Sequence, residues 1–125
     1  MNGNGKKNWF IVDGWMPSRE QTADAGYEGH ECIMILNCND RPADVRMDIF
    51  YSDKDPVEDI KIAVPAKRII ALRSDNPDDM GGVKLGRREQ YSLRIRSDVE
   101  IVVQYGRMDV TQTNLAYLSV MGYSE

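Results

Sequence analysis

The residues that could carry chemistry begin with a single histidine. His30 is the only histidine in a chain of 125 residues, and Glu31 follows it directly. A Ser-His-Asp triad would have to use His30, but the chain has no Gly-x-Ser-x-Gly elbow to present a nucleophile. Neighbouring residues of a strand point to opposite faces, so His30 and Glu31 can share a site only at a strand end or a bulge. A surface histidine at the start of a strand is the simpler interpretation.

A second candidate pair follows an apolar run near the C-terminus. Arg107 and Asp109 are two residues apart, so on a strand they face the same side, whereas Gln104 faces the other side. The pair could form the polar rim of a pocket, or a surface ion pair that contributes only about 0–1 kcal/mol. Four aromatic residues could stack against a sugar or another ring, although core packing is the commoner role for such residues: Trp9, Trp15, Tyr27 and Tyr51.

The two cysteines indicate the redox compartment. Cys32 and Cys38 would lie about 20 Å apart on one extended strand. A disulfide needs Cα atoms within roughly 7 Å, so we expect two free thiols. Free thiols are typical of a reducing compartment, and the N-terminus lacks the pattern of a signal peptide. We therefore expect a cytoplasmic protein.

Composition excludes several classes of function. Hydrophobic residues make up 42% of the chain and charged residues 29%, which is typical of one folded domain. The longest apolar runs are far shorter than the ~20 residues of a membrane helix, so we do not expect membrane insertion. The net charge of −4 argues against a general nucleic-acid binder. We expect no cofactor and no metal.

Short runs with period-2 alternation, separated by turn residues, predict an all-β protein of about eight strands. The predicted strands cover 8–13, 31–37, 44–51, 59–64, 67–73, 91–97, 101–107 and 115–123. Residues 1–7 are expected to be a flexible N-terminus and 8–125 a single β-sandwich domain. The polar segment 17–29 is predicted to be a loop, and 108–116 could hold a short helical turn.

Two of these predicted strands are apolar on both faces. Residues 32–36 and 115–121 carry apolar side chains at odd and even positions alike. One face of a sheet in a sandwich is normally solvated, so the second apolar face needs a cover. A covering loop is one possibility. A subunit interface is favoured, since large apolar patches usually mark contacts.

Several segments together resemble the sensory rhodopsin transducer family of small cytosolic β-sandwich proteins. They are residues 30–37, Phe50-Tyr51-Ser52-Asp53-Lys54-Asp55-Pro56-Val57, 64–68, 97–104 with Ile-Val-Val-Gln, 107–109 and 118–123. The resemblance implies a single antiparallel, jelly-roll-like β-sandwich, a homotetramer, and binding of a sugar-like metabolite. Residues that match the family's polar motif positions are ligand-binding candidates without a catalytic role: His30, Glu31, Asn37, Tyr51, Asp53, Arg68, Gln104, Arg107 and Asp109.

Four hypotheses about function remain open at this point. The first is a homo-oligomeric module that binds a small, carbohydrate-like molecule or acts as a sensory transducer. The second is a signalling adaptor for a protein partner such as a membrane photoreceptor or a regulator. The third is an enzyme that uses the carboxylates of Glu31, Asp53 and Asp109. The weakest is DNA binding, which the net charge opposes.

Overall fold

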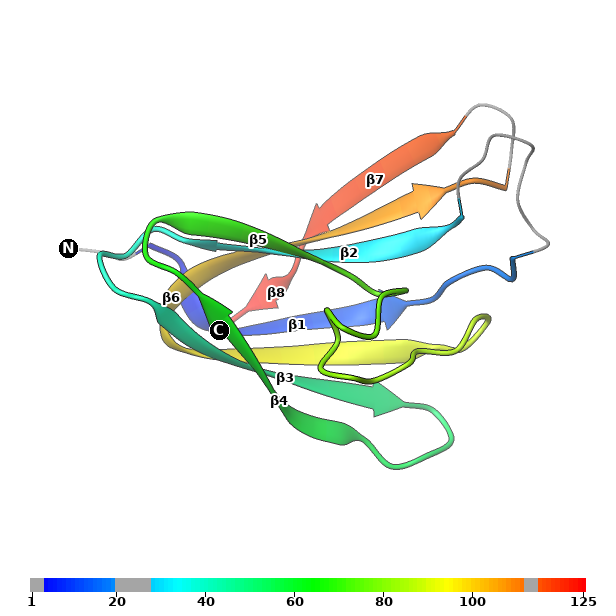
Figure 1. The fold of residues 1–125 in the computed structure, drawn as a ribbon, viewed down its shortest axis with the longest axis horizontal. Coiled ribbons are helices and arrows are strands. Elements are labelled where there is room, and N and C mark those ends of the chain that lie inside the picture. Colours follow the sequence, from blue (N-terminus) through cyan, green and yellow to red (C-terminus); the bar gives the residue numbers. More distant parts are fainter. Residues whose placement is uncertain (1–3, 20–27, 112–114) are drawn as a thin grey trace.

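The computed structural model describes residues 4–19, 28–111 and 115–125. In these ranges all regular structure is β-strand, and Figure 1 shows the strands arranged in two layers. The strands are β1 (Lys6–Gly14), β2 (His30–Asn37), β3 (Ala43–Tyr51), β4 (Val57–Val64), β5 (Arg68–Arg73), β6 (Tyr91–Asp109), β7 (Ala116–Met121) and β8 (Tyr123–Ser124). The predicted antiparallel β-sandwich is confirmed.

Strand β6 belongs to both layers. It is 19 residues long, and its first part pairs with β1 and β3 in a first sheet of order β4-β3-β6-β1-β8. Its second part pairs with β2 and β7, which together with β5 form a second sheet of order β5-β2-β6-β7. All of these pairings are antiparallel.

The core lies between the inward faces of the two sheets. Alternate residues of each strand point inward, as the period-2 pattern predicts. Fully buried aliphatic side chains from both sheets meet there, and burial of each stabilises the fold by about 1.5–3 kcal/mol. They include Ile33, Ile35, Val45, Met47, Ile49, Ile95, Ile101 and Val103.

Two predictions about the C-terminal half are wrong. The segments predicted as separate strands, 91–97 and 101–107, form the single strand β6. The polar residue Asp98 does not end the strand, because its carboxylate accepts the backbone N–H of Asp44 at 2.8 Å from the neighbouring strand. The helical turn expected from residue 108 is also replaced by β6, in which Met108 pairs with Tyr117. Residues 112–114 lie outside the described ranges.

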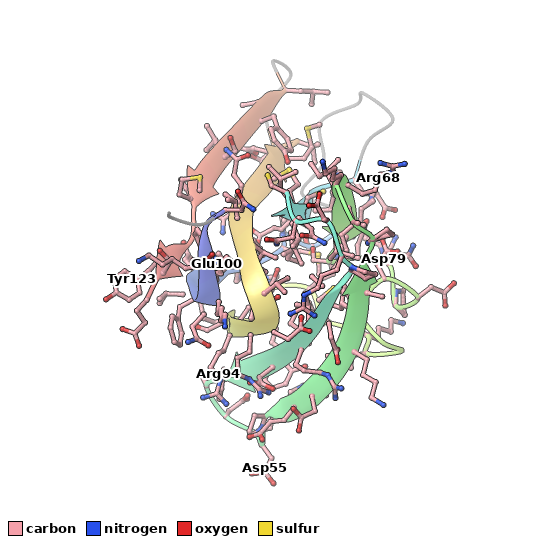
Figure 2. The ribbon with its side chains drawn as sticks, turned by 90° about the vertical axis from the view of Figure 1, so that its left-hand side faces the viewer. Asp55, Arg68, Asp79, Arg94, Glu100 and Tyr123 are labelled. Atoms are coloured by element: carbon pink, nitrogen blue, oxygen red, sulfur yellow. The ribbon has the colours of Figure 1, made fainter. Side chains whose placement is uncertain are left out.

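The outer faces of the two sheets differ in chemistry. The first sheet carries a cluster of charged side chains from β3, β4 and β6, with Arg94 on its outer side in Figure 2. The second sheet exposes Leu36, Ile69, Tyr117 and Met121. The expectation that β2 has a second apolar face therefore agrees with the structure.

Candidate functional site

Glu31 is a charged side chain buried inside the sandwich, at the end where β2 begins and β6 ends (Figure 1). It is 1% exposed. Its Oε1 accepts hydrogen bonds from the backbone N–H of Trp15 and the hydroxyl of Tyr91, both at 2.9 Å. The hydroxyl of Tyr105 also donates to Oε1, and Nε of Arg107 donates to Oε2. Burial of a carboxylate is costly unless it is hydrogen-bonded, and these four donors offset that cost.

The backbone of Glu31 is held as firmly as its side chain. Its N–H donates to Oγ of Ser74 at 2.9 Å, and the N–H of Ser74 donates to the carbonyl of Glu31 at 2.8 Å. Oγ of Ser74 then donates to the sulfur of Met16 at 3.1 Å. Glu31 is thus fixed by the chain after β1, the chain after β5 and three positions of β6.

The two tyrosines act as hydrogen-bond donors to Glu31. Burial raises the pKa of Tyr91, and the nearby Glu31 carboxylate raises it further. Burial likewise raises the pKa of Tyr105, with added repulsion from Tyr91 and Glu31. Both phenols stay protonated at neutral pH, and their hydroxyls also contact one another. The buried polar groups therefore form a closed network, which is the arrangement that keeps such a core stable.

Arg107 connects this network to the surface. Burial lowers its pKa, but the hydrogen bond and charge of Glu31 outweigh that effect and raise the pKa of Arg107 above its usual value. The side chain is 36% exposed. Its Nε is held by Glu31, and Nη2 lies 3.7 Å from Oδ2 of Asp13. A guanidinium oriented in this way presents its terminal N–H groups in a fixed direction.

Two surface hollows meet at Arg107. The first, here named the β1–β7 groove, has a volume of about 340 Å³ and is lined by residues of β1, β6, β7 and β8. The second, here named the Trp15 hollow, has a volume of about 160 Å³. Small-molecule sites usually occupy about 300–1,000 Å³, so the groove has the usual size and the hollow would take a small ring or a fragment.

The Trp15 hollow brings together three of the predicted ligand-binding residues. Its lining includes His30, Arg107 and Asp109 with the half-buried ring of Trp15. The Nδ1 of His30 is 3.0 Å from the carbonyl of Glu28, which places a proton on Nδ1. A flat aromatic ring beside directed polar groups is suited to a sugar or a similar polyol. Residues 20–27, with Tyr27, lie outside the described ranges.

The other predicted site residues lie elsewhere. Asn37 and Arg68 pair at the opposite end of the second sheet, and Asn37 is fully buried. Its amide donates to the carbonyl of Val64 at 3.1 Å, a structural contact. Figure 2 shows Arg68 on the opposite side of the molecule from Tyr123. Gln104 faces outward and donates to Oγ of Ser119 at 3.3 Å.

Tyr51 and Asp53 are at the end of β3 and do not line either hollow. Tyr51 pairs with Tyr91 in register, but its ring faces Nζ of Lys54 at 4.3 Å. Asp53 is exposed in the turn after β3. The described geometry therefore links Tyr51 to the site only through its neighbour Tyr91.

Sequence reasoning missed two residues that donate hydrogen bonds to the buried carboxylate of Glu31. Tyr91 and Tyr105 are 60 and 74 residues away from Glu31 along the chain. Their alternation with polar neighbours indicates buried strand positions, and this pattern is the only signal in the sequence. Asp13, which lies beside Arg107, was not predicted either.

A second buried carboxylate was also missed. Asp48 is fully buried although it is on the outer face of the first sheet. Its carboxylate accepts hydrogen bonds from the backbone N–H of Asp59 at 2.9 Å, from Nε of Arg94 at 2.8 Å and from Nη2 of Arg96 at 2.9 Å. Burial raises its pKa, but these hydrogen bonds outweigh burial, and the pKa of Asp48 lies below its ordinary value. Asp59 adopts φ 61° at the bulge that this contact supports.

Two kinds of feature are absent from the described ranges. Within residues 4–19, 28–111 and 115–125, no three His, Cys, Asp or Glu side chains are grouped to hold a metal ion. The same ranges contain no helix with the length and apolar character needed to cross a membrane.

Comparison with known proteins agrees with the resemblance seen in the sequence. A solved structure of Thermotoga maritima 1070 has a TM-score of 0.83 and 26% identity, over 98% of this chain and 97% of that one. The Anabaena sensory rhodopsin transducer has a TM-score of 0.70 and 32% identity, over 83% of this chain and 89% of that one. No curated protein matches. The family model for Anabaena sensory rhodopsin transducer matches residues 4–124, and the chain belongs to this family.

Proposed function

We propose that this protein is a non-catalytic transducer module that responds to a small, carbohydrate-like molecule bound in the Trp15 hollow. The observation that supports this proposal is the guanidinium of Arg107, which is held by the buried Glu31 and lines the hollow beside Trp15. Asp109 and His30 line the same hollow and offer further hydrogen-bonding groups. Family membership favours a signalling role.

The state of Glu31 argues against catalysis at this site. A general base must offer a lone pair to the proton that it abstracts. Both carboxylate oxygens of Glu31 already accept hydrogen bonds from donors of the protein itself. A carboxylate in this position orients Arg107 and does not face a substrate.

We also propose a cytoplasmic homotetramer assembled through the outer face of the second sheet. Leu36, Ile69 and Tyr117 are exposed there, and Ile69 is 63% exposed. Burial of these apolar side chains between copies would stabilise the assembly by about 25 cal/mol for each Å² of apolar surface removed from water.

Binding can be tested with Trp15 as its own reporter. Tryptophan emission is recorded while glucose, galacturonate and a polyol are titrated into the wild-type protein. A ligand in the hollow should change the Trp15 signal, and His30→Ala should weaken that change about tenfold or more. Lys61→Gln, on the exposed side of β4, is the control variant. A panel that leaves the emission unchanged would remove the support for a carbohydrate-like ligand.

An adaptor for a protein partner is the second candidate function. The relative called Anabaena sensory rhodopsin transducer is named for a photoreceptor, and this chain is 32% identical to it. The exposed apolar face of the second sheet favours such a partner if it stays open in solution. A monomer by light scattering would support the adaptor, and a tetramer that buries Ile69 would oppose it.

A further inference from the structure

The β1–β7 groove is open because its two walls diverge. β1 pairs with the first part of β6 and β7 with the second, and Figure 1 shows β7 rising away from β1. Leu118 and Val120 lie opposite Arg107 and Tyr105, so they are on the inner side of the second sheet. They are nevertheless 60% and 61% exposed. These two side chains face the groove and not the core.

The groove is apolar along most of its length. Its walls are formed by Phe10 and Val12 of β1, Leu118 and Val120 of β7, and Met121 and Tyr123 beyond them. The rings of Phe10 and Tyr123 are tilted, with centroids 6.2 Å apart. Apolar walls of this kind favour a ligand with an apolar body, because each contact removes apolar surface from water.

One end of the groove carries a cation and an anion side by side. Nη2 of Arg107 is 3.7 Å from Oδ2 of Asp13, which is too long for a direct hydrogen bond. Nε of Arg107 is occupied by Glu31, whereas its terminal nitrogens have no hydrogen bond to any residue in the described ranges. The other carboxylate oxygen of Asp13, Oδ1, accepts a hydrogen bond from Nε2 of Gln90 at 3.0 Å. Nη2 of Arg107 and Oδ2 of Asp13 therefore lie side by side, and both residues line this end of the groove.

The charges of this pair select the ligand. Glu31 takes only Nε of Arg107, and the side chain of Asp13 is 73% exposed, so donors of Arg107 and an acceptor of Asp13 are both open to a ligand. A ligand with only a carboxylate would place it beside the carboxylate of Asp13, and one with only an ammonium would leave the donors of Arg107 without an acceptor. A sugar would leave the apolar walls uncovered. A zwitterion with an apolar body meets all three requirements.

We infer that the β1–β7 groove binds an α-amino acid with a large apolar side chain. The carboxylate accepts hydrogen bonds from the terminal nitrogens of Arg107, and the ammonium donates to Oδ2 of Asp13. The side chain lies along Leu118 and Val120. This site shares Arg107 with the Trp15 hollow but does not rest on a carbohydrate ligand there.

Calorimetric titration of the wild-type protein tests the charge requirement. L-Phenylalanine is compared with 3-phenylpropionate, which lacks the ammonium, with 2-phenylethylamine, which lacks the carboxylate, and with glycine, which lacks the apolar body. L-Phenylalanine should bind at least about tenfold more tightly than each of the three. Equal or tighter binding of 3-phenylpropionate would overturn the inference, as would no heat from L-phenylalanine or L-leucine.

Two variants with matched controls locate the site. Asp13→Asn should remove the advantage of L-phenylalanine over 3-phenylpropionate, whereas Asp55→Asn, in the exposed turn after β3, should keep it. Val120→Glu should abolish binding, and Ala63→Glu, at an exposed position of β4, should not. Circular dichroism checks that each variant is folded. Unchanged binding in both Asp13→Asn and Val120→Glu would overturn the inference, and a failed sugar titration would not affect it.

Discussion

Glu31 links the stability of the fold to the proposed site. Its carboxylate receives donors from Trp15, Tyr91, Tyr105 and Arg107, so it fixes one end of the sandwich and orients the guanidinium at the same time. Removal of one partner of a buried ion pair leaves an uncompensated group in the core. The same substitution should therefore affect both unfolding and ligand recognition.

Glu31→Gln should lower the free energy of unfolding by about 3 kcal/mol, because the buried charge that pairs with Arg107 is lost. Urea denaturation measures this change through the midpoint and slope. The double variant with Arg107→Met should be less destabilised than the sum of the two single variants. Additive losses would show that Glu31 and Arg107 do not act as a pair.

Asp48→Asn should lower the free energy of unfolding by about 2–3 kcal/mol at neutral pH, because hydrogen bonds to a buried charge are lost. The pKa of Asp48 is lowered in the folded state, so its contribution is present above the ordinary pKa of 3.8 and is lost as the pH falls through the lower, folded value. The difference between wild type and variant should then shrink in acid. Urea midpoints at several pH values check this, with Asp55→Asn as the control, and a difference that grows in acid would contradict it.

At the residue scale, the sequence indicates which polar residues matter but not which ones meet. The Arg107–Asp109 pattern at the end of an apolar run predicts that both residues share a face, because they are two apart on a strand, and both line the Trp15 hollow. The contacts of Glu31 with Tyr91 and Tyr105 depend on the pairing of β2 and β6. Asn37 shows a different limit of the sequence. It is a ligand-binding candidate by its position in the motif, but its buried amide donates a hydrogen bond to the backbone carbonyl of Val64.

At the scale of elements, β1 packs closely against β6 beside the site. A Cβ added at Gly14 would lie 2.3 Å from Cε2 of Tyr91. The Tyr91 ring cannot move aside freely, because its hydroxyl is tied to Glu31. The glycine at the end of β1 is therefore required for the position of Tyr91.

Gly14→Ala should lower the free energy of unfolding by about 1–3 kcal/mol, the usual cost of overpacking. Thermal unfolding by circular dichroism measures the change. Gly86→Ala is the matched control, because its added Cβ would meet only the side chain of Glu89. A Gly14→Ala protein as stable as wild type would show that Tyr91 has room to shift.

The strands themselves could largely be predicted, because period-2 alternation is strong in β3, β4 and β6. The continuity of β6 could not be predicted, since Ser97 and Asp98 are residues typical of a turn. Both residues instead stay within β6 and contact β3. Ser97 pairs with Val45, and the carboxylate of Asp98 accepts a hydrogen bond from the backbone N–H of Asp44. Local composition does not reveal such long-range partners.

At the scale of the whole molecule, the apolar outer face of the second sheet predicts self-association. Light scattering after size exclusion should give a homotetramer for the wild type. Leu36→Glu with Ile69→Glu should give smaller species, because two charges would be buried in the interface. Val12→Glu, an exposed apolar position outside this face, should leave the tetramer intact. A wild-type monomer would contradict the proposed assembly.

The central claim is that Arg107, oriented by Glu31, recognises a small molecule. The most direct test is thermal unfolding of wild type and Arg107→Lys with a panel of sugars, sugar acids and amino acids. A ligand at 100 times its dissociation constant should stabilise the wild type by about 2.7 kcal/mol, a shift of several degrees. Lysine keeps the charge but loses the fork of N–H donors, so the shift should largely disappear in the variant. A panel without effect on the wild type, or an equal shift in both proteins, would contradict the claim.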